Sequence, residues 1–250
     1  MRQKYRPCVL VIYTIGLMNL FYFSVFALAK EISNQDFKRS KVYCQKAINY
    51  GFKNKLKEAE EALKKSLQLN PFNRSSVAVL KWIEDFKEGV ISREYIQCLF
   101  EASRDVNLNI FKSAIEKLQK AIQINPTYPS SYYNIGLCYL ALGNYQQAIA
   151  YYKKVVEIKP SAEAYHGLAS AYGYAQQHQE VINYSQKSLG LDPKYALSYF
   201  NLGVAYWNLK QYDKAKENLQ RAMELLKQEG NDNDAAGVEE ELQRLKTLSQ

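Results

Sequence analysis

A chain of 250 residues with a net charge of +8 has room for one elongated domain and none for a second large one. Its 33 Lys and Arg are interspersed with 25 Asp and Glu, as between Glu58 and Lys65, which is typical of solvated helix surfaces. A nucleic-acid-binding protein needs a clustered basic stripe, so the charge pattern argues against nucleic acid as a partner.

The amino terminus has a different composition from the rest of the chain. Three basic residues precede an uncharged apolar run from Cys8 to Ala29, which ends in Ala-Leu-Ala before Lys30. Basic residues, an apolar core and a small-x-small cleavage site are typical of a secretory signal peptide, which we therefore predict over residues 1–29. The run is also long enough for an uncleaved membrane anchor with its basic end in the cytoplasm. We expect a polar linker over residues 30–39.

Both alternatives place the rest of the chain outside the cytoplasm. A cleaved protein is expected to be periplasmic or extracellular, and an uncleaved one to be anchored in the membrane. Loss of the basic residues Arg2, Lys4 and Arg6 lowers the net charge to +5.

Four prolines end similar phrases along the remaining sequence: Pro71, Pro126, Pro160 and Pro193. The last three are 34 and 33 residues apart. Because proline cannot continue a helix, each phrase is predicted to end one. A period of this length indicates a stack of small helical units.

The units share an internal pattern as well as their prolines. The clearest has Tyr132, Ile135-Gly136 and Tyr139, followed by the turn Gly143-Asn144 and then by Ala148 and Tyr152. The next two have Tyr165, Leu168-Ala169, Tyr172 and Tyr199, Leu202-Gly203, Tyr206. This pattern resembles the tetratricopeptide repeat. The resemblance implies an all-α fold, a right-handed solenoid of helical hairpins in which small residues such as Gly136 and Gly203 lie where helices cross.

The pattern assigns the chain in order. We expect a degenerate repeat at 40–73, with Lys46 at a Leu position, and an extra helix or partial repeat at 74–94. Full repeats are expected at 95–128, 129–161, 162–195 and 196–229. The apolar stripe of Val238, Leu242, Leu245 and Leu248 predicts a capping helix at 234–250.

Catalytic or metal-binding residues are sparse. The two histidines, His166 and His178, are twelve residues apart, and no phosphate-binding or nucleophile motif is present. Outside the amino-terminal segment, Cys44, Cys98 and Cys138 are expected as free core thiols, with a Cys98–Cys138 disulfide as the alternative. We therefore expect no enzyme, no catalytic residue, no metal site and no cofactor.

The resemblance implies a protein-binding groove on the concave side of the solenoid, lined by the first helix of each repeat. Carried onto this chain, its residues are Tyr133, Leu137, Leu140, His166, Ser170, Tyr174, Phe200, Val204, Trp207 and Asn208. The other groove positions hold Ser130, Ala141, Glu163, Gly173 and Leu197. Some of these side chains, Leu137 and Val204 above all, are alternatively expected to contact a neighbouring helix. The Lys and Asn of an acidic-peptide clamp are not at the required positions.

These expectations combine into two functional hypotheses. The first is an exported scaffold or adaptor that holds a peptide or helix of a protein partner in an aromatic groove. The alternative is a membrane-anchored adaptor that acts by self-association, as a homo-oligomer, or by assembly with other repeat proteins.

The amino-terminal hypothesis gives the first testable prediction. We expect signal peptidase to cleave between Ala29 and Lys30, because the small residues fit its pocket and Lys30 begins polar sequence. Intact-mass or amino-terminal analysis of the exported protein measures this directly. Recovery of an intact Met1–Ala29 segment in the membrane fraction would favour the anchored alternative.

Overall fold

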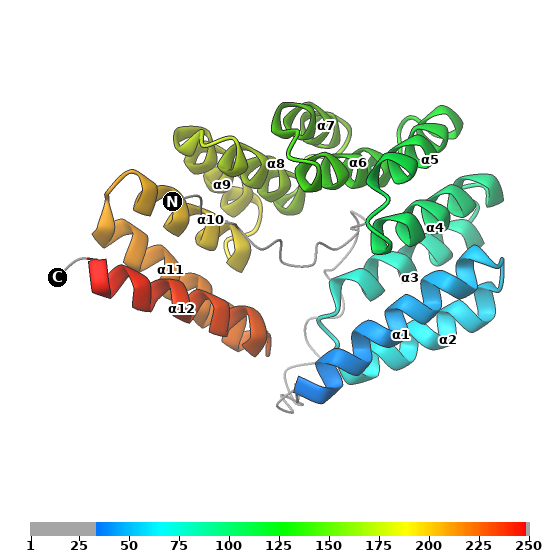
Figure 1. The fold of residues 1–250 in the computed structure, drawn as a ribbon, viewed down its shortest axis with the longest axis horizontal. Helices are drawn as coiled ribbons and strands as arrows, with labels where there is room; N and C mark the ends of the chain where they lie inside the picture. The colour runs from blue at the N-terminus through cyan, green and yellow to red at the C-terminus, as the bar shows by residue number, and fades with distance from the viewer. Residues whose placement is uncertain (1–33, 249–250) are drawn as a thin grey trace.

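The computed structural model describes residues 34–248, which form twelve α-helices arranged in an arc (Figure 1). The first six are α1 (Asn34–Phe52), α2 (Leu56–Leu69), α3 (Arg74–Lys87), α4 (Arg93–Asn107), α5 (Phe111–Ile124) and α6 (Pro129–Ala141). The others are α7 (Tyr145–Ile158), α8 (Ala162–Tyr174), α9 (His178–Leu191), α10 (Ala196–Asn208), α11 (Tyr212–Gln228) and α12 (Asp232–Leu248). The all-α solenoid of helical hairpins is confirmed for the described part of the chain.

The repeated prolines end helices as the sequence predicts. Four helices stop at the residue before a proline, and that residue is extended in each case: Asn70, Asn125, Lys159 and Asp192. The proline ring disfavours helical backbone in the preceding residue, so the chain leaves the helix at a fixed point. The same link therefore recurs after α2, α5, α7 and α9.

The turns inside the hairpins each use one residue with a left-handed backbone. In the turn between α6 and α7 this residue is Gly143, with φ of 74°, whereas the adjacent Asn144 has φ of −92°. Gly143, which has no Cβ atom, thus takes the left-handed position of the predicted turn. In the next two hairpins Gln176 and Lys210 take the same conformation at φ of 61°, which is less favourable for residues with a Cβ atom.

Close helix crossings hold neighbouring repeats together. An ideal Cβ atom built on Gly136 of α6 lies 3.0 Å from the Tyr152 ring of α7, and one on Gly167 of α8 lies 2.9 Å from it. Tyr152 is 1% exposed and packs edge-on against Tyr133, with ring centroids 5.1 Å apart. One aromatic side chain thus fills the space between three helices because two of them lack a side chain at the contact.

Helix α3 is a first helix without its own second helix. Ser76 donates a 2.7 Å hydrogen bond to Ser66 of α2, and Ser198 of α10 donates a 2.7 Å bond to Ser188 of α9 in the same way. Helix α3 therefore docks on the preceding repeat as a regular first helix does. Helix α3 also contacts α6, beyond the repeat of α4 and α5, where Trp82 Nε1 donates to Ser130 Oγ at 3.2 Å.

Helix α4 packs against α1 rather than completing a hairpin with α3. Gln97 donates a 3.1 Å hydrogen bond to the Phe52 carbonyl, and the Arg104 guanidinium carbon lies 3.9 Å from the centre of the Phe52 ring. The irregular stretch from α3 to α4 changes the course of the solenoid and brings its two ends into contact. An ideal Cβ on Gly230, in the turn between α11 and α12, lies 3.1 Å from the Phe72 ring in the link before α3.

The two ends of the described chain differ slightly from the expected boundaries. Helix α1 begins at Asn34, so a linker extending to residue 39 is wrong: residues 34–39 already belong to the helix. At the carboxyl end α12 begins at Asp232, and its Val238 and Leu242 are buried in a cluster with Leu219 and Leu226 of α11. The last helix thus covers the apolar surface of α11, as expected for a cap.

Other expectations concern the cysteines and the membrane. Cys44, Cys98 and Cys138 are free, and burial raises the pKa of each thiol. None of the helices in residues 34–248 is long and apolar enough to cross a membrane. The predicted signal peptide or anchor, residues 1–29, lies outside the described residues.

Replacing a glycine by alanine should have opposite effects on stability at Gly203, which lies at a helix crossing, and at Gly190, which does not. Gly203→Ala should lower the free energy of unfolding by about 1–3 kcal/mol, because the new methyl group would lie 2.6 Å from Leu219 Cγ. Gly190→Ala, near the end of α9 with open space around it, should raise stability by up to about 1 kcal/mol. Urea unfolding followed by circular dichroism measures both. Equal effects would contradict the role of Gly203 as a close crossing.

Candidate functional site

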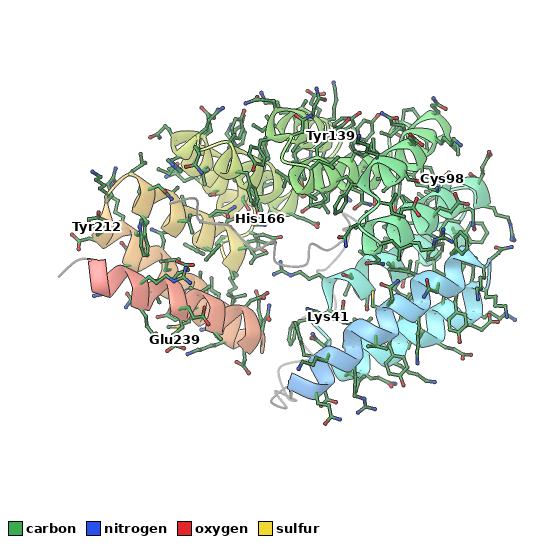
Figure 2. All side chains as sticks on the ribbon, viewed as in Figure 1. Lys41, Cys98, Tyr139, His166, Tyr212 and Glu239 are labelled. Carbon is green, nitrogen blue, oxygen red and sulfur yellow. The ribbon has the colours of Figure 1, made fainter. Side chains whose placement is uncertain are left out.

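The inner face of the arc is formed by the first helices of the three regular repeats, α6, α8 and α10. Figure 2 shows His166 of α8 on this inner side, whereas Tyr139 and Tyr212 lie toward the outside. The inner face is therefore the place to compare with the groove predicted from the resemblance.

Two of the predicted groove residues are in the core. Tyr133 is 3% exposed, held by the edge-on contact with Tyr152, and Leu137 is 9% exposed within the same apolar cluster. The expectation that Tyr133 faces a partner is wrong, because its ring fills the space between α6, α7 and α8. For Leu137 the alternative of a neighbour contact holds.

The other predicted residues remain at least partly exposed. Leu140 packs at the border of the apolar cluster around Tyr152, and Tyr174 stacks on Tyr145 with ring centroids 5.8 Å apart. Phe200 and Trp207 of α10 are half-buried against the cluster of α11 and α12. Val204 is also half-buried, and Asn208 is exposed and donates to the Val204 carbonyl at 2.8 Å. The exposed aromatic surface thus lies mainly on α8 and α10.

A polar cluster joins α8 to α10 on this face. Asn201 Nδ2 donates to His166 Nδ1 at 3.1 Å and also lies 3.1 Å from Ser170 Oγ. The His166 ring packs on Tyr195, with centroids 5.5 Å apart. Burial, together with the positive charge of Arg74, lowers the pKa of His166 to about 3, so its ring is neutral and accepts the bond from Asn201.

Arg74, the first residue of α3, reaches this face from the opposite end of the arc. Its guanidinium carbon lies 6.0 Å from the centre of the Tyr195 ring. Sequence reasoning placed neither Arg74 nor Tyr195 at the site. Tyr195 directly precedes α10, so its position in the repeat could have indicated that it lies near the groove. Arg74 gave no such signal, because it approaches Tyr195 only through the curvature of the solenoid.

Two open cavities lie away from the inner face. One, of about 580 Å³, is lined by Gln97 and Cys98 of α4, Lys120 of α5 and Asn54 in the turn between α1 and α2. The other, of about 490 Å³, lies beside Ile115 and Tyr139. No group of three or more His, Cys, Asp or Glu in residues 34–248 is arranged to hold a metal ion.

Comparison with known proteins establishes the family. Models described as tetratricopeptide repeat match residues 34–73, 129–161 and 161–228, and one described as TPR repeat matches 106–143. Together they cover more than half of the chain, and they leave out α3 and most of α4. The chain belongs to the tetratricopeptide-repeat proteins, a family of scaffolds for protein–protein contacts.

Individual relatives share only part of their length with this chain. A heat-shock protein cognate co-chaperone, sgt12, of Aspergillus fumigatus is 29% identical over 101 residues, which are 40% of this chain and 30% of the relative. A peroxisomal targeting signal receptor of Candida albicans is 25% identical over 195 residues, or 68% of this chain and 33% of the relative. The matches thus span about a third of these relatives.

A solved structure shows the same fold. The crystal structure of MamA superposes with a TM-score of 0.50 at 21% identity, covering 72% of this chain and 93% of MamA. At this identity the likeness establishes the arrangement of the helices.

The half-buried His166, with its lowered pKa, predicts a pH dependence of stability. A folded-state pKa of about 3 lies below the usual value near 6.5, so the unfolded chain binds more protons between these values. Stability should therefore fall as the pH drops below about 6.5. His166→Gln should reduce the loss between pH 7.5 and pH 5 by about 1–2 kcal/mol. Urea unfolding of both proteins at the two pH values tests this, and identical losses would place His166 in solvent.

Proposed function

We propose that this protein is a scaffold that holds an extended or helical segment of a protein partner against the inner face of α8 and α10. The observation that carries the proposal is the pair of half-buried aromatic side chains of α10, Phe200 and Trp207, on the helix whose Asn201 forms the polar cluster with His166 and Ser170 of α8. Aromatic anchors next to fixed hydrogen-bonding groups are what a peptide-binding surface requires.

The energetics favour this face over the outer helices. Phe200 and Trp207 are already held in place on one side by the α11–α12 cluster. Because they are partly ordered before binding, a partner that covers their remaining surface loses little side-chain entropy. The outer surface of α11 carries mainly charged residues, such as Lys214, Lys216 and Glu217, which are exposed and costly to desolvate.

The chemistry of the inner face also narrows the class of partner. Clamps for an acidic carboxyl terminus place Lys and Asn at the fifth and ninth positions of the repeats. Here the fifth positions are Tyr133, His166 and Phe200, and His166 is neutral. An acidic carboxy-terminal peptide is therefore disfavoured as the ligand.

We further propose that the protein works outside the cytoplasm. The support is the basic and then apolar composition of residues 1–29. The alternative, an anchored adaptor that self-associates, differs in its oligomeric state. Native mass spectrometry of residues 30–250 distinguishes the two, because self-association predicts a concentration-dependent oligomer and the scaffold predicts a monomer.

Partner binding gives the next prediction. The double change Phe200→Ala and Trp207→Ala should weaken capture of an extracellular or envelope partner at least about 30-fold, since each aromatic anchor contributes roughly 1–3 kcal/mol and about 1.4 kcal/mol is a factor of ten. The matched control is Tyr212→Ala, which removes an exposed aromatic ring from the first residue of α11. Affinity capture with quantitative mass spectrometry compares the three proteins.

Circular dichroism and urea unfolding show whether the double variant is folded. Full-strength binding by a folded double variant contradicts the inner-face proposal. Loss of binding in Tyr212→Ala alone would indicate that the partner binds the outer surface.

A further inference from the structure

The second residue of α8 carries a carboxyl group that the structure leaves without a partner. Glu163 Oε1 is buried and accepts no hydrogen bond from any residue between 34 and 248. Glu163 lies in the first turn of its helix, where the free backbone N–H groups favour a negative charge. A buried carboxyl oxygen without a donor is costly, so its position on the proposed binding face points to a donor supplied by a ligand.

The surrounding charges do not satisfy Glu163. The positive groups acting on it are Arg74 of α3 and Lys159 at the end of α7, and both favour the ionised form. Burial outweighs them and raises the pKa of Glu163 to about 8. His166, one turn along α8, is neutral and contributes no positive charge.

A second carboxyl group shares the same guanidinium. Burial also raises the pKa of Glu229, at the end of α11, while Arg74 opposes the shift and Asp192 and Asp234 add to it. Arg74 therefore acts on two half-buried carboxyl groups, one at the start of α8 and one at the end of α11. Among residues 34–248, Arg74 is the positive group that acts on both carboxyl groups, and burial outweighs it at each.

Aromatic rings complete the surroundings of this region. The centroid of the Tyr195 ring lies 5.5 Å from that of the His166 ring and 6.0 Å from the Arg74 guanidinium carbon. Ring faces attract cations, so a second cation arriving here would meet both an aromatic surface and a carboxylate. An anion would meet two carboxyl groups instead.

We propose that this part of the inner face binds a basic side chain, Lys or Arg, of the partner segment, and that Glu163 is the group that accepts its charge. This inference rests on the proposed function and adds the chemistry of the ligand. The incoming ammonium or guanidinium group donates to the unsatisfied Oε1 atom, and a proton leaves Glu163 for solvent as the carboxylate forms.

The proton that Glu163 loses on binding can be measured. Near pH 7 most free protein carries a protonated Glu163, so binding of a basic peptide should release close to one proton. The affinity for that peptide should rise about tenfold from pH 7 to pH 9, because the competing proton is lost over this range. A neutral peptide should show neither effect.

The experiment uses an array of random 12-residue peptides, each printed with Lys, Arg or Gln at its centre and probed with the chain from residue 30 to 250. We expect at pH 8 at least a tenfold preference for Lys or Arg over Gln. Glu163→Gln, which keeps the size of the side chain, should reduce the preference to less than twofold. The matched control is Glu217→Gln, on an exposed position of α11.

The strongest array peptides are then measured by calorimetry at pH 7 in phosphate and in Tris buffer, which reveals proton release. The Lys peptide should release protons with the unaltered chain and not with Glu163→Gln. An equal preference in both proteins, or no proton release, overturns the inference.

Failure of the inference can be separated from failure of the proposed function. Peptides that bind regardless of the central residue, and lose binding when Phe200 and Trp207 are changed, overturn the basic-residue site and leave the scaffold intact. No binding of any peptide contradicts both.

Discussion

The packing of one aromatic ring against two glycines positions the rest of the structure. Tyr152 fills the space between α6, α7 and α8 only because Gly136 and Gly167 leave room for it. A single helical hairpin buries too little apolar surface to be stable, so contacts of this kind, shared between repeats, supply the core. On the inner face α10 is tied to α8 by Asn201, which donates to His166 and lies within hydrogen-bond distance of Ser170.

Curvature then brings distant residues to the same surface. Helix α3 lacks a second helix, α4 packs on α1 instead, and the chain turns until Phe72 contacts the turn at Gly230. Arg74 consequently approaches Tyr195, which is far away in sequence. In this arrangement the irregular region contributes the positively charged Arg74 to the inner face.

The sequence predicted the features that depend on local chemistry. Proline ended helices at Asn70 and Asp192, and glycine supplied the turn at residue 143, because backbone limits of this kind act within a few residues. It failed where a contact depends on neighbouring helices. Tyr133 was expected to be exposed, yet the ring of Tyr152 covers it, and the position of Arg74 follows from the path of α3 and α4.

Covalent capture at defined positions is the most direct test of the inner face as the binding surface. Replacing Phe200 with the photoreactive residue p-benzoylphenylalanine preserves an aromatic ring, and the same replacement at Tyr212 samples the outer end of the arc (Figure 2). Illumination of cells that produce each variant should crosslink a partner from position 200 and none from position 212. Crosslinking from position 212 and none from position 200 would contradict the account.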